Sequence, residues 1–254
     1  MRVRHVLVAL LAAGLTVSSA PPLRATEAAP TRSATAVHAA PGAPLLLAAP
    51  ARPRISVNAP GPAGSKRGTG KRAVALTFDD GPDPVYTPKL LDVLKAHRVK
   101  ATFCVLGDKV AQHPRTARRI RAEGHRLCNH TRNHPDMAKL SSSAARKQVL
   151  DTQWRVRKVT GVTPTTFRFP YGSSNSRVRA VVQSCQLRTL GWDVDTRDWE
   201  RPSAGTITNR IVRNVRPGSV VLMHDGGGNR TTTVAALDST IRQLKKKGYT
   251  FVLA

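Results

Sequence analysis

The sequence predicts an α/β fold in which a parallel β-sheet is covered by helices. Beyond residue 70, segments with strand character alternate with segments of helical periodicity. Seven strands that alternate with helices imply a parallel sheet. An open doubly wound sheet and a barrel both satisfy this order, and both bind ligands at the carboxyl ends of their strands.

The predicted elements follow one another regularly along the chain. The expected strands are residues 73–78, 101–106, 126–129, 166–169, 188–194, 219–224 and 250–253. The expected helices are residues 87–96, 114–123, 142–160, 176–184, 206–215 and 233–247. Helix ends carry the usual signals, because serines 141 to 143 offer N-caps and Gly124, Gly161 and Gly248 come just past helix ends.

The first 70 residues differ in character from the rest. Residues 1–25 resemble a secretory signal peptide, with Arg2 and Arg4 before a short apolar core and small residues after it. A membrane anchor is disfavoured, because a bilayer span takes about 20 apolar residues. Residues 26–70 are rich in Ala, Pro and Gly and are expected to form a flexible linker before a folded domain at 71–254. We therefore expect an extracellular or cell-wall protein without a stable membrane anchor after cleavage.

The chain is strongly basic, with 41 Lys+Arg against 15 Asp+Glu and a formal charge of +26. Such a charge favours attraction to polyanions such as an anionic cell wall, although a generic basic surface is the favoured explanation of the arginines taken singly. Specific nucleic-acid binding is not expected, because no such motif occurs and aromatic residues make up only 4%. Eight of the acids cluster in three segments, at residues 79–83, 193–200 and 225.

Three cysteines occur, at Cys104, Cys128 and Cys185. In an exported protein an odd number allows at most one disulfide and leaves a free thiol. All three lie in apolar or strand-like contexts, which favours buried free thiols. Their spacing does not resemble a zinc site.

Ionisable and polar residues gather where five of the expected strands end. In chain order these are Asp79 and Asp80; His130 and His134; Arg168, Pro170 and Tyr171; Asp195 and Asp198; and His224 and Asp225. Because the carboxyl ends of parallel strands share one edge of a sheet, this coincidence predicts one site.

A metal centre is the first chemistry that these residues suggest. His130 and His134 are four positions apart, so on a helical turn both imidazoles would share a face and meet one ion. Asp80, from another strand end, is the natural third ligand. Two histidines and one carboxylate suit catalytic Zn²⁺, and they also suit the non-haem Fe(II) of oxygenases.

The remaining ionisable residues complete a set for hydrolysis. Asp79 does not ligate the metal in this scheme and is free to act as general base toward a metal-activated water, with Arg168 paired to it. His224 would protonate the leaving group, and Asp198 would favour its imidazolium form. Together these residues predict metal-assisted hydrolysis with a separate base and acid.

Five ordered motifs in the folded part resemble those of the polysaccharide deacetylases, also called carbohydrate esterase family four or NodB-like. They are Thr77–Pro82 (TFDDGP), His130–His134 (HTRNH), Arg168–Gly172 (RFPYG), Asp195–Trp199 (DTRDW) and Leu222–His224 (LMH). The resemblance covers residues 71–254. It implies a distorted (β/α) barrel of about seven parallel strands with outer helices, and hydrolysis of acetyl groups on a polysaccharide with a divalent metal.

The roles that the family resemblance implies for these positions agree with the roles inferred above from the chemistry of the residues. The resemblance adds the backbone N–H of Tyr171 as an oxyanion donor, and Leu222 and Trp199 as walls of the acetyl pocket. Two departures stand out. Phe169 occupies a position where the family often has Pro, and Cys104 and Cys128 lie on strands that the family fold makes neighbours, which raises a Cys104–Cys128 disulfide as a hypothesis.

The expected function is therefore N-deacetylation of N-acetylglucosamine polymers, either peptidoglycan or chitin and its oligosaccharides, by a monomer that uses Zn²⁺, or alternatively Co²⁺ or Mn²⁺. Weaker alternatives are an O-acetyl esterase on acetylated xylan, an Fe(II) oxygenase and a non-catalytic wall-binding protein. Trp192 is expected in the core, Asp193 and Glu200 in solvent, and Gly226–Gly228 in a flexible loop.

Overall fold

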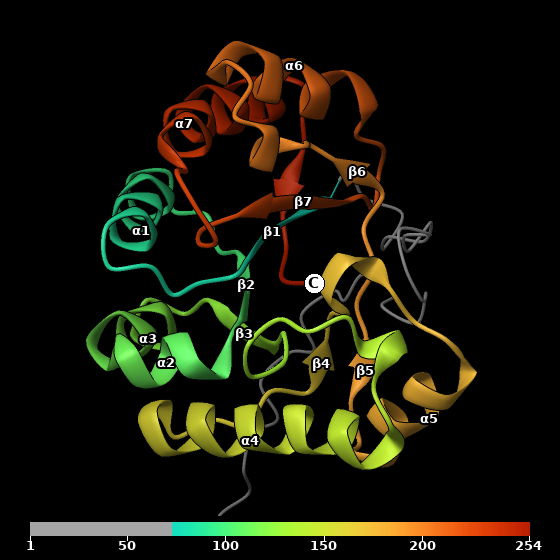
Figure 1. Cartoon of the computed structure of the whole chain (residues 1–254). Coiled ribbons are helices and arrows are strands. Elements are labelled where there is room, and N and C mark those ends of the chain that lie inside the picture. Colours follow the sequence, from blue (N-terminus) through green and yellow to red (C-terminus); the bar gives the residue numbers. More distant parts are fainter. Residues whose placement is uncertain (1–72) are drawn as a thin grey trace, which may run out of the picture. The chain divides into compact units, whose positions relative to one another are not determined.

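The computed structural model describes residues 73–254, which form one curled sheet with helices outside it (Figure 1). The signal peptide expected at 1–25 and the linker expected at 26–70 lie outside the described residues. Within the described part, no helix combines the length and the apolar character needed to cross a membrane.

The sheet is parallel and has β1 at its centre. Its order is β5-β4-β3-β2-β1-β7-β6, and β8 pairs with the start of β1. The strands are β1 Ala73–Asp79, β2 Thr102–Val105, β3 Arg126–Asn129, β4 Thr166–Phe167, β5 Arg188–Thr189, β6 Val194–Asp195, β7 Val220–His224 and β8 Thr250–Phe251. The expected parallel α/β fold is confirmed, and its barrel is a half-barrel, because no backbone pairing within residues 73–254 joins β5 to β6.

The fifth expected strand, 188–194, is wrong as a single element. It divides into β5 and β6, which lie at opposite ends of the sheet. Between them the carbonyl oxygens of Leu190 and Gly191 accept hydrogen bonds from the buried Arg168 guanidinium, at 3.4 and 3.0 Å. Those carbonyls accept hydrogen bonds from a side chain instead of from a neighbouring strand, so the backbone hydrogen bonding of the sheet is interrupted there.

All six expected helices are present, with boundaries within two residues of the prediction. They are α1 Tyr86–Ala96, α3 Pro114–Ala122, α4 Ser142–Thr160, α5 Ser176–Ser184, α6 Ala204–Asn214 and α7 Thr231–Lys246. Ser141 caps α4 by accepting a hydrogen bond from the Ala144 N–H, and Gly161 ends it in the left-handed conformation. A short helix, α2 Gly107–Gln112, was not expected, since six residues carry too little periodicity to be recognised. Figure 1 shows α6, α7, α1, α3, α4 and α5 forming an arc around the sheet.

The two faces of the sheet have different contents because successive side chains of a strand alternate between them. Val74, Leu76 and Phe78 belong to the large apolar cluster that also contains residues of α1, α3, α6 and α7. Ala75 belongs to a second, smaller cluster, which leaves room on that face for Thr77 and Asp79. All seven residues of β1 are buried. Because β1 is an inner strand of the sheet, its polar end lies near the middle of the carboxyl edge.

Cys104 and Cys128 lie directly opposite each other on β2 and β3, and both are fully buried. All three cysteines are free thiols in the structure, so the hypothesised disulfide is absent. Side chains at opposed positions of a parallel pair run alongside each other, whereas a disulfide needs Cβ vectors that turn toward each other. Burial raises the pKa of the Cys104 thiol, which makes it less reactive.

Candidate active site

A cavity of about 620 Å³ opens at the carboxyl edge of the sheet. Eight of the ten predicted site residues line it, and they come from the ends of β1, β3, β4, β6 and β7 and the segments that follow. Those eight are Asp79, Asp80, His130, His134, Tyr171, Trp199, Leu222 and His224. The other two, Arg168 and Asp198, are fully buried behind the lining. The structure therefore brings the whole predicted set together.

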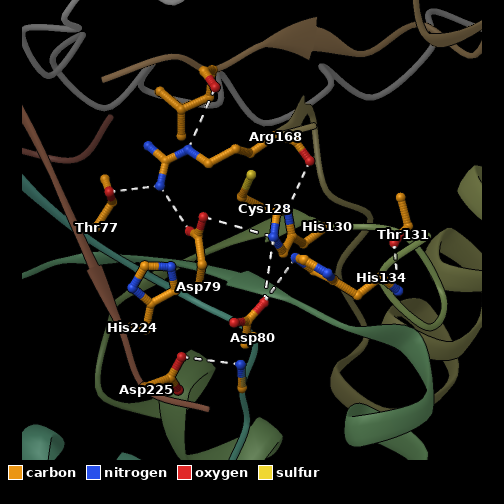
Figure 2. Close-up of polar contacts among 12 residues, drawn as sticks. Thr77, Asp79, Asp80, Cys128, His130, Thr131, His134, Arg168, His224 and Asp225 are labelled. Carbon is orange, nitrogen blue, oxygen red and sulfur yellow. Dashed lines mark hydrogen bonds and ion pairs between the residues drawn. The ribbon is translucent and has the colours of Figure 1, made fainter. Parts of the chain in front are cut away.

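Asp80, His130 and His134 form a three-residue cluster in which the possible ligand atoms all lie within 4.8 Å of one another. The Oδ1 atom of Asp80 is 3.5 Å from the Nε2 atom of His130 and 3.3 Å from that of His134 (Figure 2). The same Oδ1 atom is buried and has no hydrogen-bond partner. A buried carboxylate oxygen without a partner is costly, and a cation shared with the two imidazoles would compensate it. The donor set thus fits a divalent metal.

The two histidines do not lie on a helical turn, so that part of the prediction was wrong. Residues 130–136 form a loop after β3. Thr131 and His134 take left-handed backbone conformations, with φ of 72° and 65°, and Thr131 Oγ1 accepts a hydrogen bond from the His134 N–H at 3.0 Å. The local turn therefore brings the two rings to a centroid separation of 5.0 Å.

His130 is held with its Nε2 atom toward the carboxylates. Its Nδ1 atom donates to the backbone carbonyl of Arg168 at 2.8 Å, which orients the ring in the way typical of metal-ligating histidines. Burial alone would lower the pKa of His130, but the charges of Asp79 and Asp80 raise it to about 9. The negative field that favours a proton here also favours a metal cation.

Asp79 has a separate partner. Its Oδ1 atom accepts a hydrogen bond from Arg168 at 2.7 Å, and both groups are buried. Arg168 also donates to Thr77 Oγ1 at 2.7 Å, so the guanidinium is fixed from several sides. The Oδ2 atom of Asp79 lies 3.7 Å from His130 Nε2, next to the metal cluster. Asp79 is therefore positioned beside the cluster with its charge balanced by Arg168.

His224 and Asp198 form a second buried pair. Asp198 accepts hydrogen bonds from the His224 ring Nδ1 at 2.6 Å, from the His224 backbone N–H at 2.9 Å and from Thr233 Oγ1 at 2.8 Å. Burial alone would lower the pKa of His224, but the hydrogen bond and charge of Asp198 raise it above its ordinary value. With Nδ1 held by Asp198, Nε2 is the ring nitrogen left for chemistry, and Figure 2 shows the ring beside Asp79 and Asp80.

Residues 225–228 pack against Asp80 and Gly81, and they were not assigned a role from the sequence. The buried Asp225 carboxylate accepts from the Gly81 N–H at 3.1 Å and from Thr87 Oγ1 at 2.6 Å, and burial raises its pKa to about 7. A Cβ at Gly81 would lie 2.0 Å from Asp225, and one at Gly226 would lie 2.4 Å from the Asp80 carbonyl. The segment expected to be a flexible loop is therefore packed against the metal cluster, and the glycines permit this approach.

Three further pocket residues were missed or misassigned. Trp192, expected in the core, is half-buried and lines the cavity, with the Arg168 guanidinium 5.6 Å from its ring. Leu106 and Arg230 also line the cavity. Trp192 lies within the break between β5 and β6, and Arg230 follows the glycine loop. Their positions therefore depend on irregular segments that periodicity cannot place.

Comparison with known proteins agrees with this geometry. A family model described as "Polysaccharide deacetylase" matches residues 66–190. The chain is 39% identical over 195 residues to a chitooligosaccharide deacetylase of Sinorhizobium fredii, covering 72% of this chain and 91% of that protein. The chain belongs to the polysaccharide deacetylase family. Its fold is the one expected from the resemblance.

Two more relatives show how far the similarity extends. A peptidoglycan-N-acetylglucosamine deacetylase of Listeria monocytogenes is 44% identical over 187 residues, but the match spans 74% of this chain and only 39% of that protein. A crystal structure of a peptidoglycan N-acetylglucosamine deacetylase in complex with 4-naphthalen-1-yl-N-oxidanyl-benzamide has a TM-score of 0.70 and 43% identity, covering 72% of this chain and 86% of that one. The shared part is thus the folded domain that carries the pocket.

Proposed function

We propose that this polysaccharide deacetylase is an exported, metal-dependent enzyme that removes N-acetyl groups from N-acetylglucosamine polymers. One observation carries the proposal. A partnerless buried carboxylate oxygen of Asp80 faces two imidazoles, and two independently paired groups, Asp79 and His224, line the same cavity. A metal ligand set, a base and an acid are the parts that amide hydrolysis requires.

Asp80, His130 and His134 would hold the metal. Two histidines and a carboxylate suit Zn²⁺, and Co²⁺ or Mn²⁺ are alternatives. When bound, a divalent cation makes water more acidic and polarises a carbonyl oxygen.

Asp79 and His224 would move the protons. Asp79 Oδ1 is occupied by Arg168, so Oδ2 would take a proton from the attacking water, whose oxygen bonds to the acetyl carbon. Nε2 of His224 would then give a proton to the amide nitrogen as the C–N bond breaks, which releases acetate and leaves a free amine on the sugar. Asp198 holds His224 by Nδ1 throughout.

The surrounding residues would position the substrate. The Tyr171 N–H would donate to the developing oxyanion, and φ of 58° at this residue shows a backbone held in a sparsely populated region, as is common at functional sites. Leu222 is buried and Trp199 is half exposed at the cavity, which suits a small apolar pocket for the acetyl methyl group beside a sugar-stacking surface.

The names of relatives support peptidoglycan or chitooligosaccharides as substrates of this chain. The signal-like residues 1–25 support export, and the formal charge of +26 supports attraction to an anionic cell wall. We propose that the exported domain acts as a monomer on the wall polymer.

The test is acetate release from chitin oligomers, peptidoglycan and acetylated xylan, with and without a chelator. We expect release from the N-acetylated polymers, its loss with chelator and its return with Zn²⁺. Asp80→Ala should lose metal and activity together. Asp238→Ala should lose neither, because this half-exposed carboxylate on α7 pairs with His97 and Arg242, outside the cavity. Release from xylan alone would show an O-acetyl esterase, and release from none would show a non-catalytic wall-binding protein.

A further inference from the structure

Two arginines, Arg230 in the wall of the pocket and Arg201 beside it, form a cationic wall with no carboxylate partner among residues 73–254. Arg230 is 4% exposed and lines the cavity, and within the described residues its guanidinium makes one hydrogen bond, from Nε to the Gly226 carbonyl at 2.7 Å. Arg201, exposed at the end of the short 3-10 helix Asp198–Glu200, has no ion pair among residues 73–254. By contrast, Arg197 in the same segment is paired with Glu200.

Arg230 and Arg201 converge on one point. A Cβ built on Gly228 would lie 3.7 Å from Nη2 of Arg230 and 4.0 Å from Nη2 of Arg201. Gly228 has a φ of 146°, which other residues rarely adopt, so this space is kept free of a side chain. Two guanidinium groups of like charge beside one open space repel each other unless an anion lies between them. Burial of a charge without a partner, as at Arg230, is costly and indicates a missing counter-ion.

The cavity that Arg230 lines also contains exposed aromatic rings. Trp199, two residues before Arg201, is 50% exposed and lines the cavity, as does Tyr171, which is 72% exposed. Exposed aromatic rings offer stacking surfaces for sugars. A glycan that stacks on Trp199 would bring the substituents of its neighbouring ring toward Arg201 and Arg230.

We propose that Arg230 and Arg201 form an anion subsite that binds a carboxylate carried by the sugar adjacent to the acetamido sugar being deacetylated. Guanidinium groups bind carboxylates through paired, charge-assisted hydrogen bonds. The inference rests on the proposed deacetylase function and selects between its two substrates. Chitin oligomers are neutral, whereas peptidoglycan alternates N-acetylglucosamine with a sugar that bears a lactyl acid. The carboxylate could belong to a peptide-free lactyl group or to an attached peptide.

The experiment compares three tetrasaccharides with the full-length protein loaded with Zn²⁺. They are a neutral chitin tetramer, a peptide-free peptidoglycan tetramer with free lactyl carboxylates, and the same tetramer with peptides attached. The measured quantity is the ratio of kcat/KM for each acidic substrate to kcat/KM for the neutral one. We expect an acidic tetramer to be favoured about tenfold, mainly through KM, and the advantage to shrink at high salt. The acidic substrate with the larger ratio identifies the source of the carboxylate.

Variants assign this preference to the two arginines. Arg230→Gln should lower the ratio roughly tenfold, and Arg201→Gln, at an exposed position where folding is safe, should lower it several-fold. Arg213→Gln, an equal charge loss on the exposed end of α6, should leave the ratio unchanged. Acetate release with no preference for either acidic tetramer, or a preference unchanged in Arg201→Gln and Arg230→Gln, would overturn the anion subsite alone. Absence of release from all three tetramers would instead overturn the deacetylase proposal.

Discussion

Asp79 and Asp198 are two buried carboxylates of the candidate site, and they differ in the group that balances their charge. Asp79 is bonded at 2.7 Å to Arg168, whereas Asp198 is bonded at 2.6 Å to His224. A guanidinium keeps its proton at any ordinary pH, but an imidazole titrates near neutrality. The first pair therefore keeps a constant charge, while the second can release a proton.

Under the proposed mechanism, this difference lets one pocket hold a base and an acid at the same pH. Both carboxylates are satisfied by hydrogen bonds, so burial alone does not distinguish them. The identity of the partner distinguishes them. Beside the permanently charged Arg168, the Asp79 carboxylate is the group that can take a proton. Beside Asp198, the titratable His224 is the group that can give one.

The largest expected effect is at Asp79. Asp79→Asn keeps the size of the side chain but removes the base, so kcat should fall about 10³-fold. Because Asp79 is not among the predicted ligands, the purified variant should still contain stoichiometric metal by elemental analysis. Unchanged acetate release from N-acetylglucosamine oligomers would show that Asp79 is not the base.

Arg168 should affect stability as well as activity. Arg168→Met leaves Asp79 buried without its charged partner, which should lower the free energy of unfolding by about 3–5 kcal/mol. Denaturant unfolding measures this loss. The double variant Asp79→Asn with Arg168→Met removes the unpaired buried carboxylate of Asp79, so it should be more stable than Arg168→Met alone. If the two changes are simply additive, the pair does not interact as described.

Asp198 should set the pH range of activity. Asp198 raises the pKa of His224, so Asp198→Asn should lower that pKa. The acid must be protonated to act, and activity is lost as pH rises through its pKa. The alkaline limb of the kcat/KM profile should therefore move to lower pH in Asp198→Asn, with roughly a tenfold loss at neutral pH. A limb that stays in place would assign it to another group.

Thr233 should give the smallest effect. Thr233 donates one of the three hydrogen bonds to Asp198, and Thr233→Val removes it while keeping the shape. The free energy of unfolding should fall by about 1 kcal/mol, with less than about a threefold change in kcat/KM. Thr240→Val, at a buried threonine on the same helix that bonds Thr208, is the matched control, because it should cost similar stability without touching the acid pair.

Much of the site was predictable because its residues follow regular strands. Asp79 ends β1 with Asp80 directly after it, and His224 ends β7, so their positions at strand ends were enough to predict that they gather at one edge of the sheet. The structure places His224 directly opposite Asp79. The pairing of His130 with His134 was predicted correctly for a wrong reason, since a left-handed loop and not a helix brings them together. Trp192, Asp225 and Arg230 had no such regularity to reveal them.

The sequence by itself determined the alternation of strands and helices, the edge where polar groups gather, and the residues proposed as metal ligands, base and acid. Local patterns suffice for these because they depend on the periodicity of burial along each segment. Only the tertiary structure decided the break at residues 190–193, where Arg168 takes backbone carbonyls from the sheet. It also decided the packing of Gly226–Gly228 against Asp80 and the convergence of Arg201 and Arg230, because contacts between distant segments depend on close approach in space.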